Sequence, residues 1–251
     1  MEQRKNYLQY NLDSRFSSNS DLNNPNFIYN NIGFSRSSKL KIVECSIPLT
    51  FYKFTSSNNT LVVQENVGAS FNVSITPGNY TNTTIATELT TRLNAASVNA
   101  RTYTCSVSTT TGKLTISVSA GTFAILSTSN SQCLRFLGLV ASGQTSTKTG
   151  SYVVDLNPSK YIHLVSNSLS SGLQNQSSVI DTTPNSIVVE TFYNNRNSYE
   201  NLYWKVRNPQ DYYLADDDLD SISFYLMDDA GNVLDLNGAS FSVKIAFYNG
   251  E

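Results

Sequence analysis

Polar and apolar residues alternate along much of the chain from residue 39 onward, which is the pattern of β-strands with one buried face. The alternation is clearest near the C-terminus, where one face would carry Phe241, Val243, Ile245 and Phe247. Other runs of this type are separated by Gly, Pro and Asn turn signals. We expect strands at 39–47, 61–64, 70–75, 103–107, 114–118, 123–126, 152–155, 161–165, 186–192, 201–206, 221–227, 233–236 and 240–248.

One segment has the period of a helix instead. Between Thr83 and Ala96, apolar side chains recur at intervals of four, at Ile85, Leu89 and Leu93. Threonine and asparagine at 81–84 can cap the first N–H groups of this helix. A second, shorter helix is expected at 132–137, where Gly138 would end it.

The order of these elements predicts an all-β protein. Many short strands, regular turn signals and long crossing connections favour a single jelly-roll β-sandwich with one inserted amphipathic helix. We expect the jelly-roll domain to span 39–251, with the helix and the hairpin after it inserted around 77–140. The chain has no internal repeat of about 20–50 residues, which argues against a propeller or a solenoid.

Residues 1–38 break this pattern and are expected to form an irregular N-terminal arm. They contain eight Asn and seven Ser, and no strand or helix period persists across them. Two interpretations remain open: a flexible tail, or an arm that orders when its aromatic and basic side chains dock on a neighbouring subunit. The candidate contact residues are Arg4, Lys5, Tyr7, Tyr10, Arg15, Phe16, Phe27 and Tyr29.

The composition is neutral and polar. Only 14% of the residues are charged, the formal net charge is -2, and Asn, Ser and Thr make up 89 of 251 residues. These three residue types weaken helix interiors, so the composition excludes a coiled coil and a long helical bundle. The charge balance excludes a strongly basic nucleic-acid binder, and we expect no specific nucleic-acid partner. No apolar stretch approaches the about 18 residues of a transmembrane span, so none is expected.

The histidine and cysteine counts close off several chemistries. His163 is the only histidine, and it lies between apolar neighbours in an expected strand, so we interpret it as a structural residue. Cys45, Cys105 and Cys133 lie far apart without paired spacing, which predicts neither a zinc site nor a redox pair. We expect buried free thiols in a reducing compartment, because the N-terminus also has no apolar segment typical of a secretory signal.

Clustered aspartates are the best candidates for metal binding or hydrolysis. They are Asp216, Asp217, Asp218 and Asp220 in one cluster, and Asp228 and Asp229 in a second. Paired carboxylates can hold calcium or cleave glycosidic bonds, but adjacent aspartates are also common in solvated loops. No catalytic, cofactor-binding or metal-ligating set emerges, so we expect neither an enzyme nor a cofactor.

Several segments between residues 45 and 238 carry a resemblance to a known family through their order along the chain. They are Cys45-Ser46-Ile47-Pro48 with Phe51-Tyr52, the stretch 75–81 leading into 85–89 and 93–94, the turn and strand at 111–116, Leu137-Gly138-Leu139, and the closing run 224–238. In this order they resemble the penton, or minor capsid, proteins of virophages and polinton-like viruses. The similarity spans roughly residues 39–250.

The resemblance implies a single jelly roll that forms pentamers at icosahedral vertices, among trimers of a double-jelly-roll major capsid protein. It implies no catalytic residues. The expected partners are thus further copies of this chain and the major capsid protein, in a virion capsid assembled in the host-cell cytoplasm at the virus factory. The composition agrees with such a role, because low charge limits repulsion between copies around an axis.

An attachment protein is the main alternative. A viral fibre, turret or lectin-like protein that binds host glycans would have the same composition, but it would assemble as a trimer and present an aromatic platform to solvent. Trp204 and Tyr203 are the candidates for that platform, although core or interface packing is the favoured interpretation of Trp204. A secreted carbohydrate-active enzyme fits less well, because no signal sequence is expected.

Overall fold

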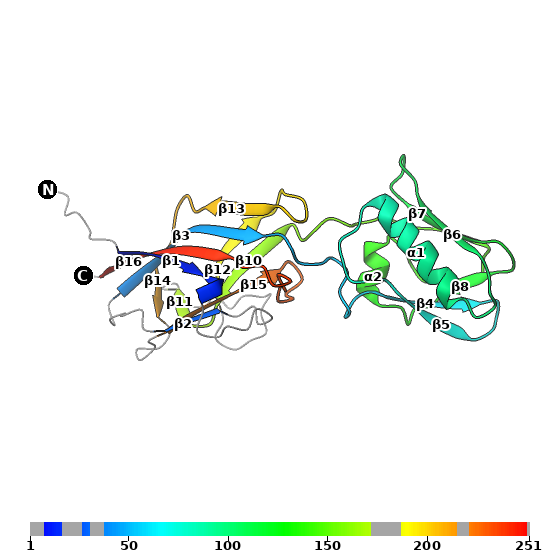
Figure 1. The fold of residues 1–251 in the computed structure, drawn as a ribbon, viewed down its shortest axis with the longest axis horizontal. Coiled ribbons are helices and arrows are strands. Elements are labelled where there is room, and N and C mark those ends of the chain that lie inside the picture. Colours follow the sequence, from blue (N-terminus) through cyan, green and yellow to red (C-terminus); the bar gives the residue numbers. More distant parts are fainter. Residues whose placement is uncertain (1–7, 17–26, 31–37, 172–186, 215–220, 250–251) are drawn as a thin grey trace. The chain divides into compact units, whose positions relative to one another are not determined.

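The computed structural model describes residues 8–16, 27–30, 38–171, 187–214 and 221–249. The chain divides into two compact units (Figure 1). The first is formed by Met1–Phe51 together with Ser159–Glu251, and the second is the intervening segment Tyr52–Pro158. Each has its own hydrophobic core, and each is described separately.

The first unit contains two antiparallel sheets. One has the strand order β1-β16-β3-β14-β11, with β13 also paired to β3, and the other has the order β12-β10-β15-β2. Most strands that are consecutive in the chain lie in opposite sheets, which is jelly-roll winding. The strands are β1 (Leu8–Asp13), β2 (Phe27–Asn30), β3 (Ser38–Pro48), β10 (Tyr161–Ser166), β11 (Leu169–Ser171), β12 (Ile187–Tyr193), β13 (Asn201–Lys205), β14 (Tyr212–Leu214), β15 (Ser221–Asp228) and β16 (Ser242–Asn249).

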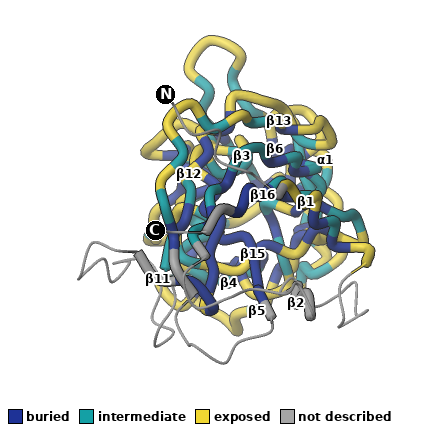
Figure 2. The backbone as a smooth tube through the Cα atoms, turned by 90° about the vertical axis from the view of Figure 1, so that its left-hand side faces the viewer, coloured by how far each residue is buried: buried dark blue, intermediate teal, exposed yellow. Residues whose placement is uncertain are grey.

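The core of this unit lies between the two sheets and follows the predicted alternation. Buried stretches run along both β15 and β16 (Figure 2). The four residues predicted to line the core are all buried in one cluster: Phe241, Val243, Ile245 and Phe247. The opposite sheet contributes Ile222, Phe224 and Leu226 to the same cluster. The all-β jelly-roll prediction is therefore confirmed, and so is the register of these two strands.

The prediction of an irregular arm over 1–38 is wrong in two places. β1 pairs with β16 along its whole length, and its Leu12 side chain enters the core. β2 pairs with β15 in the other sheet. Both strands escaped detection because each is short and lies among Asn and Ser residues, so its alternation ends before a period is established. The jelly roll thus includes strands that precede the boundary predicted at residue 39.

The second unit is larger than the insertion expected around 77–140. It contains two three-stranded sheets, β5-β4-β8 and β6-β7-β9, because strands before residue 77 contribute to its core and a strand after residue 140 pairs in its second sheet. The strand expected at 152–155 in this unit does not form. In the jelly-roll unit, the strand expected at 233–236 does not form either, and Val233 makes only an isolated bridge with Met227. The elements are β4 (Thr60–Glu65), β5 (Ser70–Ser74), α1 (Asn82–Ala96), β6 (Tyr103–Val107), β7 (Leu114–Val118), β8 (Phe123–Ile125), α2 (Ser131–Phe136) and β9 (Thr147–Thr149).

The predicted amphipathic helix is α1. Its N-cap residue Thr81 and Thr84 bond reciprocally, each side chain accepting a hydrogen bond from the other's backbone N–H. Its apolar side chains at the predicted interval of four, Ile85, Leu89 and Leu93, are all fully buried. The helix therefore begins where capping residues are available and packs the face that the sequence pattern indicates.

We expect β1 to be required for folding of the jelly-roll unit. A chain that starts at Ser38 lacks both β1 and β2, leaving the outer edge of β16 and its core side chains without a neighbour. It should lose the cooperative thermal transition of this unit, as measured by circular dichroism. A chain that starts at Tyr7 keeps both strands and is the control. An unchanged melting profile for the shorter chain would contradict the assignment.

A point substitution tests the same strand without truncation. Leu12→Ala removes a buried leucine and should lower the free energy of unfolding by about 2–5 kcal/mol. Asn11→Ala alters the exposed neighbouring position and should change it by less than about 0.5 kcal/mol. Equal effects in urea titrations would show that the two side chains do not face opposite sides of β1.

Candidate functional site

The predicted contact residues near the N-terminus are divided by the structure. Tyr10 packs edge-to-face on Phe247, with ring centroids 5.7 Å apart, so it belongs to the fold. Arg15 forms an ion pair with Asp13 at 2.6 Å, and the neighbouring Phe16 side chain is 77% exposed. Side chains outside the described set are those of Arg4, Lys5, Tyr7, Phe27 and Tyr29, of which the last two lie in β2.

The aspartate candidates do not form a described metal site. The cluster Asp216–Asp220 lies outside the described residues. The Asp228 carboxylate accepts hydrogen bonds from the backbone N–H groups of Ala230 and Asn232, so it caps its own turn. Within the described ranges, no three His, Cys, Asp or Glu side chains are grouped to hold a metal ion.

His163 is buried in β10, and its Nδ1 atom lies 2.9 Å from the Thr191 hydroxyl. Burial lowers the pKa of His163, and the charges of Asp229 and Asp228 only partly oppose that shift. The imidazole is therefore mainly neutral at pH 7 and has a structural hydrogen-bond partner, as the sequence predicts.

The three cysteines are free and buried, in agreement with the sequence prediction. Burial raises the pKa of Cys105 to about 11 and that of Cys133 to about 12. Burial is also the main cause of a raised pKa at Cys45. All three thiols therefore remain protonated at neutral pH and are poor nucleophiles.

The aromatic platform considered for glycan binding does not form. Trp204 and Tyr203 are neighbours in β13, so their side chains point to opposite faces of the sheet. Trp204 packs against the core, where its ring lies edge-to-face on Phe192 at 6.0 Å. Tyr203 is left 62% exposed without the indole beside it.

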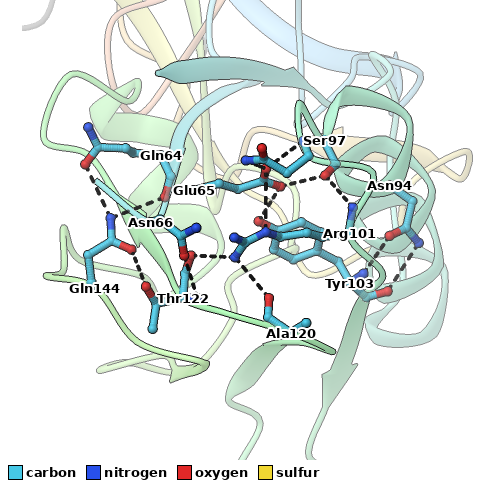
Figure 3. A network of polar contacts seen from close by, with 11 residues as sticks. Gln64, Glu65, Asn66, Asn94, Ser97, Arg101, Tyr103, Ala120, Thr122 and Gln144 are labelled. Carbon is cyan, nitrogen blue, oxygen red and sulfur yellow. Dashed lines mark hydrogen bonds and ion pairs between the residues drawn. The ribbon is translucent and has the colours of Figure 1, made fainter. Parts of the chain in front are cut away.

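An extended polar cluster (Figure 3) centres on a residue that is not among the sequence-predicted candidates. Glu65, at the end of β4, has a fully buried side chain (Figure 3). Its carboxylate accepts hydrogen bonds from the Ser97 hydroxyl at 2.6 Å, the Tyr103 hydroxyl at 3.0 Å, and both the backbone and side-chain nitrogens of Asn99 at 3.0 and 2.7 Å. Such a fully satisfied buried carboxylate fixes the segment between α1 and β6 onto β4.

Electrostatics explains why Glu65 remains ionised in this position. Burial alone raises the pKa of Glu65, but the hydrogen bonds from Ser97, Asn99 and Tyr103 outweigh it and lower the pKa below 4.5. The Arg101 guanidinium lies 3.9 Å from the carboxylate and also donates to the carbonyl oxygens of Ala120 and Thr122 (Figure 3). Every partner of the carboxylate is thus a donor held by the fold, and the cluster is structural rather than catalytic.

Helix α1 contributes polar side chains to segments on both of its flanks. On one flank, Glu88 accepts hydrogen bonds from the backbone and hydroxyl of Thr76, just after β5. On the other, Asn94 and Thr90 bond to the backbone of β6. The helix therefore joins the ends of two sheets of this unit through hydrogen bonds as well as through its apolar face.

A groove of about 440 Å³ lies between α1 and β6. Its lining contains no charged side chain and consists mostly of small hydroxyl residues. The lining residues are Asn82, Thr83, Ala86, Thr87, Thr90, Thr91, Cys105, Ser106, Val107 and Thr109. The lining has no carboxylate, histidine or cation, and the pKa of its one thiol, Cys105, is raised by burial, so the groove suits an uncharged ligand held by hydrogen bonding rather than acid–base chemistry.

Of the comparisons with protein families, curated proteins and solved structures, the comparison with solved structures gives a match. No family model matches the chain, and no curated protein matches its sequence. Among solved structures, the SeMet-labelled mavirus penton protein matches with a TM-score of 0.54 and 13% sequence identity. The match covers 98% of this chain and 100% of that one. The two proteins share a fold. Because the match covers nearly the whole chain, the likeness extends over both units described above.

We expect the Glu65 cluster to be a major source of stability for the second unit. Glu65→Gln removes the charge that four hydrogen bonds satisfy and should lower the free energy of unfolding by about 2–4 kcal/mol. Asp155→Asn, at an exposed carboxylate of the same unit, should cost less than about 0.5 kcal/mol. Urea unfolding followed by circular dichroism measures both.

The stabilisation by Glu65 should also depend on pH in a defined direction. Because the pKa of Glu65 is lowered by folding, its contribution is complete above pH 4.5 and is lost as the pH falls through the lower folded-state pKa. The stability difference between the wild type and Glu65→Gln should therefore shrink on acidification. A difference that grows as the pH falls would contradict a charged Glu65 in the folded state.

Proposed function

We propose that this chain is a structural capsid protein, a penton or minor capsid subunit that forms pentamers at the vertices of an icosahedral shell. The observation that carries the proposal is the full-length likeness to the mavirus penton protein, which extends over the jelly-roll unit and the unit inserted in it. The polar cluster around Glu65 also suits a structural role, since the carboxylate is satisfied by donors of the fold.

The exposed edges of the jelly-roll sheets support assembly into a ring. Among the described strands, β1 and β12 each end their sheet, so one backbone edge of each strand has no described partner strand. The hydrogen bond from the Ser14 N–H to the Phe241 carbonyl sets the ladder so that Gln9 and Asn11 direct their backbone groups outward. Two different edges on one subunit suit a head-to-tail contact, which closes into a ring when the rotation allows it.

Surface chemistry supports neutral, hydrogen-bonded contacts. Charged residues make up 14% of the chain, so copies packed around an axis repel one another weakly. Exposed tyrosines supply the larger contacts, and Tyr161 and Tyr193 form a tilted ring pair across β10 and β12 with centroids 5.8 Å apart. Tyrosines of this kind are enriched at protein interfaces because one part of the ring is apolar and the hydroxyl is polar.

The partners follow from the same proposal. The vertex pentamer would contact a double-jelly-roll major capsid protein, and the mature location would be the virion capsid, after assembly in the host-cell cytoplasm. Arg15 and the exposed Phe16, together with the sequence-predicted Arg4, Lys5 and Tyr7, are the proposed N-terminal contact residues. In the described part of the chain, no helix is long and apolar enough to cross a membrane.

The mass of the purified assembly tests this function. Five copies of the 27.7-kDa chain give a particle of about 139 kDa, which native mass spectrometry resolves from other states. We expect the pentamer to form in solution or on addition of the major capsid protein. A stable trimer would favour the attachment-protein alternative, and a chain that stays monomeric with the major capsid protein present would contradict the vertex role.

A further inference from the structure

One edge of strand β6 is only partly closed. Two hydrogen bonds flank the β6–β7 ladder, from the Ser108 N–H to the Lys113 carbonyl and from the Ser119 N–H to the Thr102 carbonyl. Because hydrogen-bonded pairs alternate in an antiparallel ladder, even-numbered residues of β6 bond to β7. The backbone groups of Tyr103, Cys105 and Val107 therefore point to the other side, toward α1.

Helix α1 closes this edge with side chains at matching intervals. The Asn94 side chain accepts from the Tyr103 N–H at 2.6 Å and donates to the Tyr103 carbonyl at 3.2 Å. One helical turn earlier, the Thr90 hydroxyl accepts from the Cys105 N–H at 3.0 Å. Four helix residues rise about 6.0 Å and two strand residues about 6.6 Å, so the two series stay nearly in register.

The next pair of residues in this series cannot form the corresponding side-chain-to-backbone hydrogen bond. Four residues before Thr90 the helix has Ala86, and two residues after Cys105 the strand has Val107. A methyl group accepts no hydrogen bond, and the Val107 N–H has no hydrogen-bond partner within the described part of the chain. The neutral groove between α1 and β6 lies at this point and is lined by both residues.

We propose that this groove binds an extended peptide segment with small, uncharged side chains, which adds to the open edge of β6 at Val107. The edge offers a backbone donor and acceptors in strand geometry, which are the groups that a peptide main chain complements. Thr83, Thr87 and Ser106 are among the lining residues and none of the lining residues is charged, so a charged segment would be desolvated there without compensation. α1 blocks the edge at Tyr103 and Cys105, which limits the added strand to a short one.

This inference concerns the second unit alone and goes beyond the proposed capsid role. A ring could form through the jelly-roll edges whether or not the groove is occupied, and the groove could bind a peptide in a monomer. The two proposals therefore fail independently, since one is tested by the mass of the assembly and the other by binding at a single strand edge.

Peptide binding to the full-length chain provides the test. The probe is a six-residue peptide of alternating threonine and valine, blocked at both ends, and the readout is the ¹⁵N-NMR shifts of the intact protein. We expect shifts centred on the amides of Val107 and Ser108. The same peptide with N-methylated backbone amides lacks main-chain donors and should bind at least about tenfold more weakly. Equal binding of both peptides, shifts located elsewhere, or no binding at millimolar concentration would overturn the proposal.

Two matched variants test the missing hydrogen bond directly. Ala86→Thr supplies the hydroxyl that Thr90 provides one turn later, whereas Ala86→Val has the same shape without it. In the wild type, amide hydrogen exchange at Val107 should be much faster than at Tyr103 and Cys105. Ala86→Thr should slow exchange at Val107 at least about tenfold, and Ala86→Val should slow it less. Slow exchange at Val107 in the wild type, or equal slowing in the two variants, would overturn the open edge at Val107. The peptide comparison uses the wild type alone, so it remains valid even if a variant does not fold.

Discussion

The pairing of β16 with both β1 and β3 is the interaction on which the jelly-roll unit depends. β16 lies between the first strand and the third, and its inward side chains are at the centre of the core. Its partners come from the opposite end of the chain, so the unit closes only when its two termini meet in one sheet. The cost of closing such a long loop rises only slowly with its length, which is why an insertion with its own core is tolerated between β3 and β10.

The second unit solves a different problem, that of unpaired strand edges. Its two small sheets expose edges that would otherwise accept strands from other molecules. α1 covers the outer edge of β6, whose backbone N–H groups donate hydrogen bonds to Asn94 and Thr90. Glu65 accepts hydrogen bonds from the segment that leads into β6. The abundance of Asn and Thr in this chain therefore has a structural use, because short neutral side chains can satisfy backbone groups without adding charge.

Much of this architecture was predictable from the sequence, and the exceptions have physical causes. β15, β16 and α1 are long enough for their periods to appear, so their core-facing side chains follow from the pattern, while the opposite face of β15 is also buried, around Tyr225 and Met227. β1 and β2 are short and flanked by polar residues, so their alternation is not visible in the sequence. The sequence did indicate that Glu65 is buried, because it lies on the same face of β4 as the buried Leu61 and Val63. Its hydrogen-bond partners are more than 30 residues away along the chain, and only the fold brings them together.

For Trp204, in contrast, the local sequence pattern is sufficient to place the side chain. Its parity with Leu202 in β13 places both on the buried face, whereas Tyr203 faces solvent, so the local pattern already argues against a joint platform. What local patterns cannot supply is which backbone edges remain open, because that depends on strand order across distant segments. Within the described residues no three His, Cys, Asp or Glu side chains are grouped to hold a metal ion, and the strand edges without a described neighbour offer directional backbone donors and acceptors. The fold alone does not determine a function, and recognition of other chains through the backbone edges of β1, β12 and β6 is what we propose.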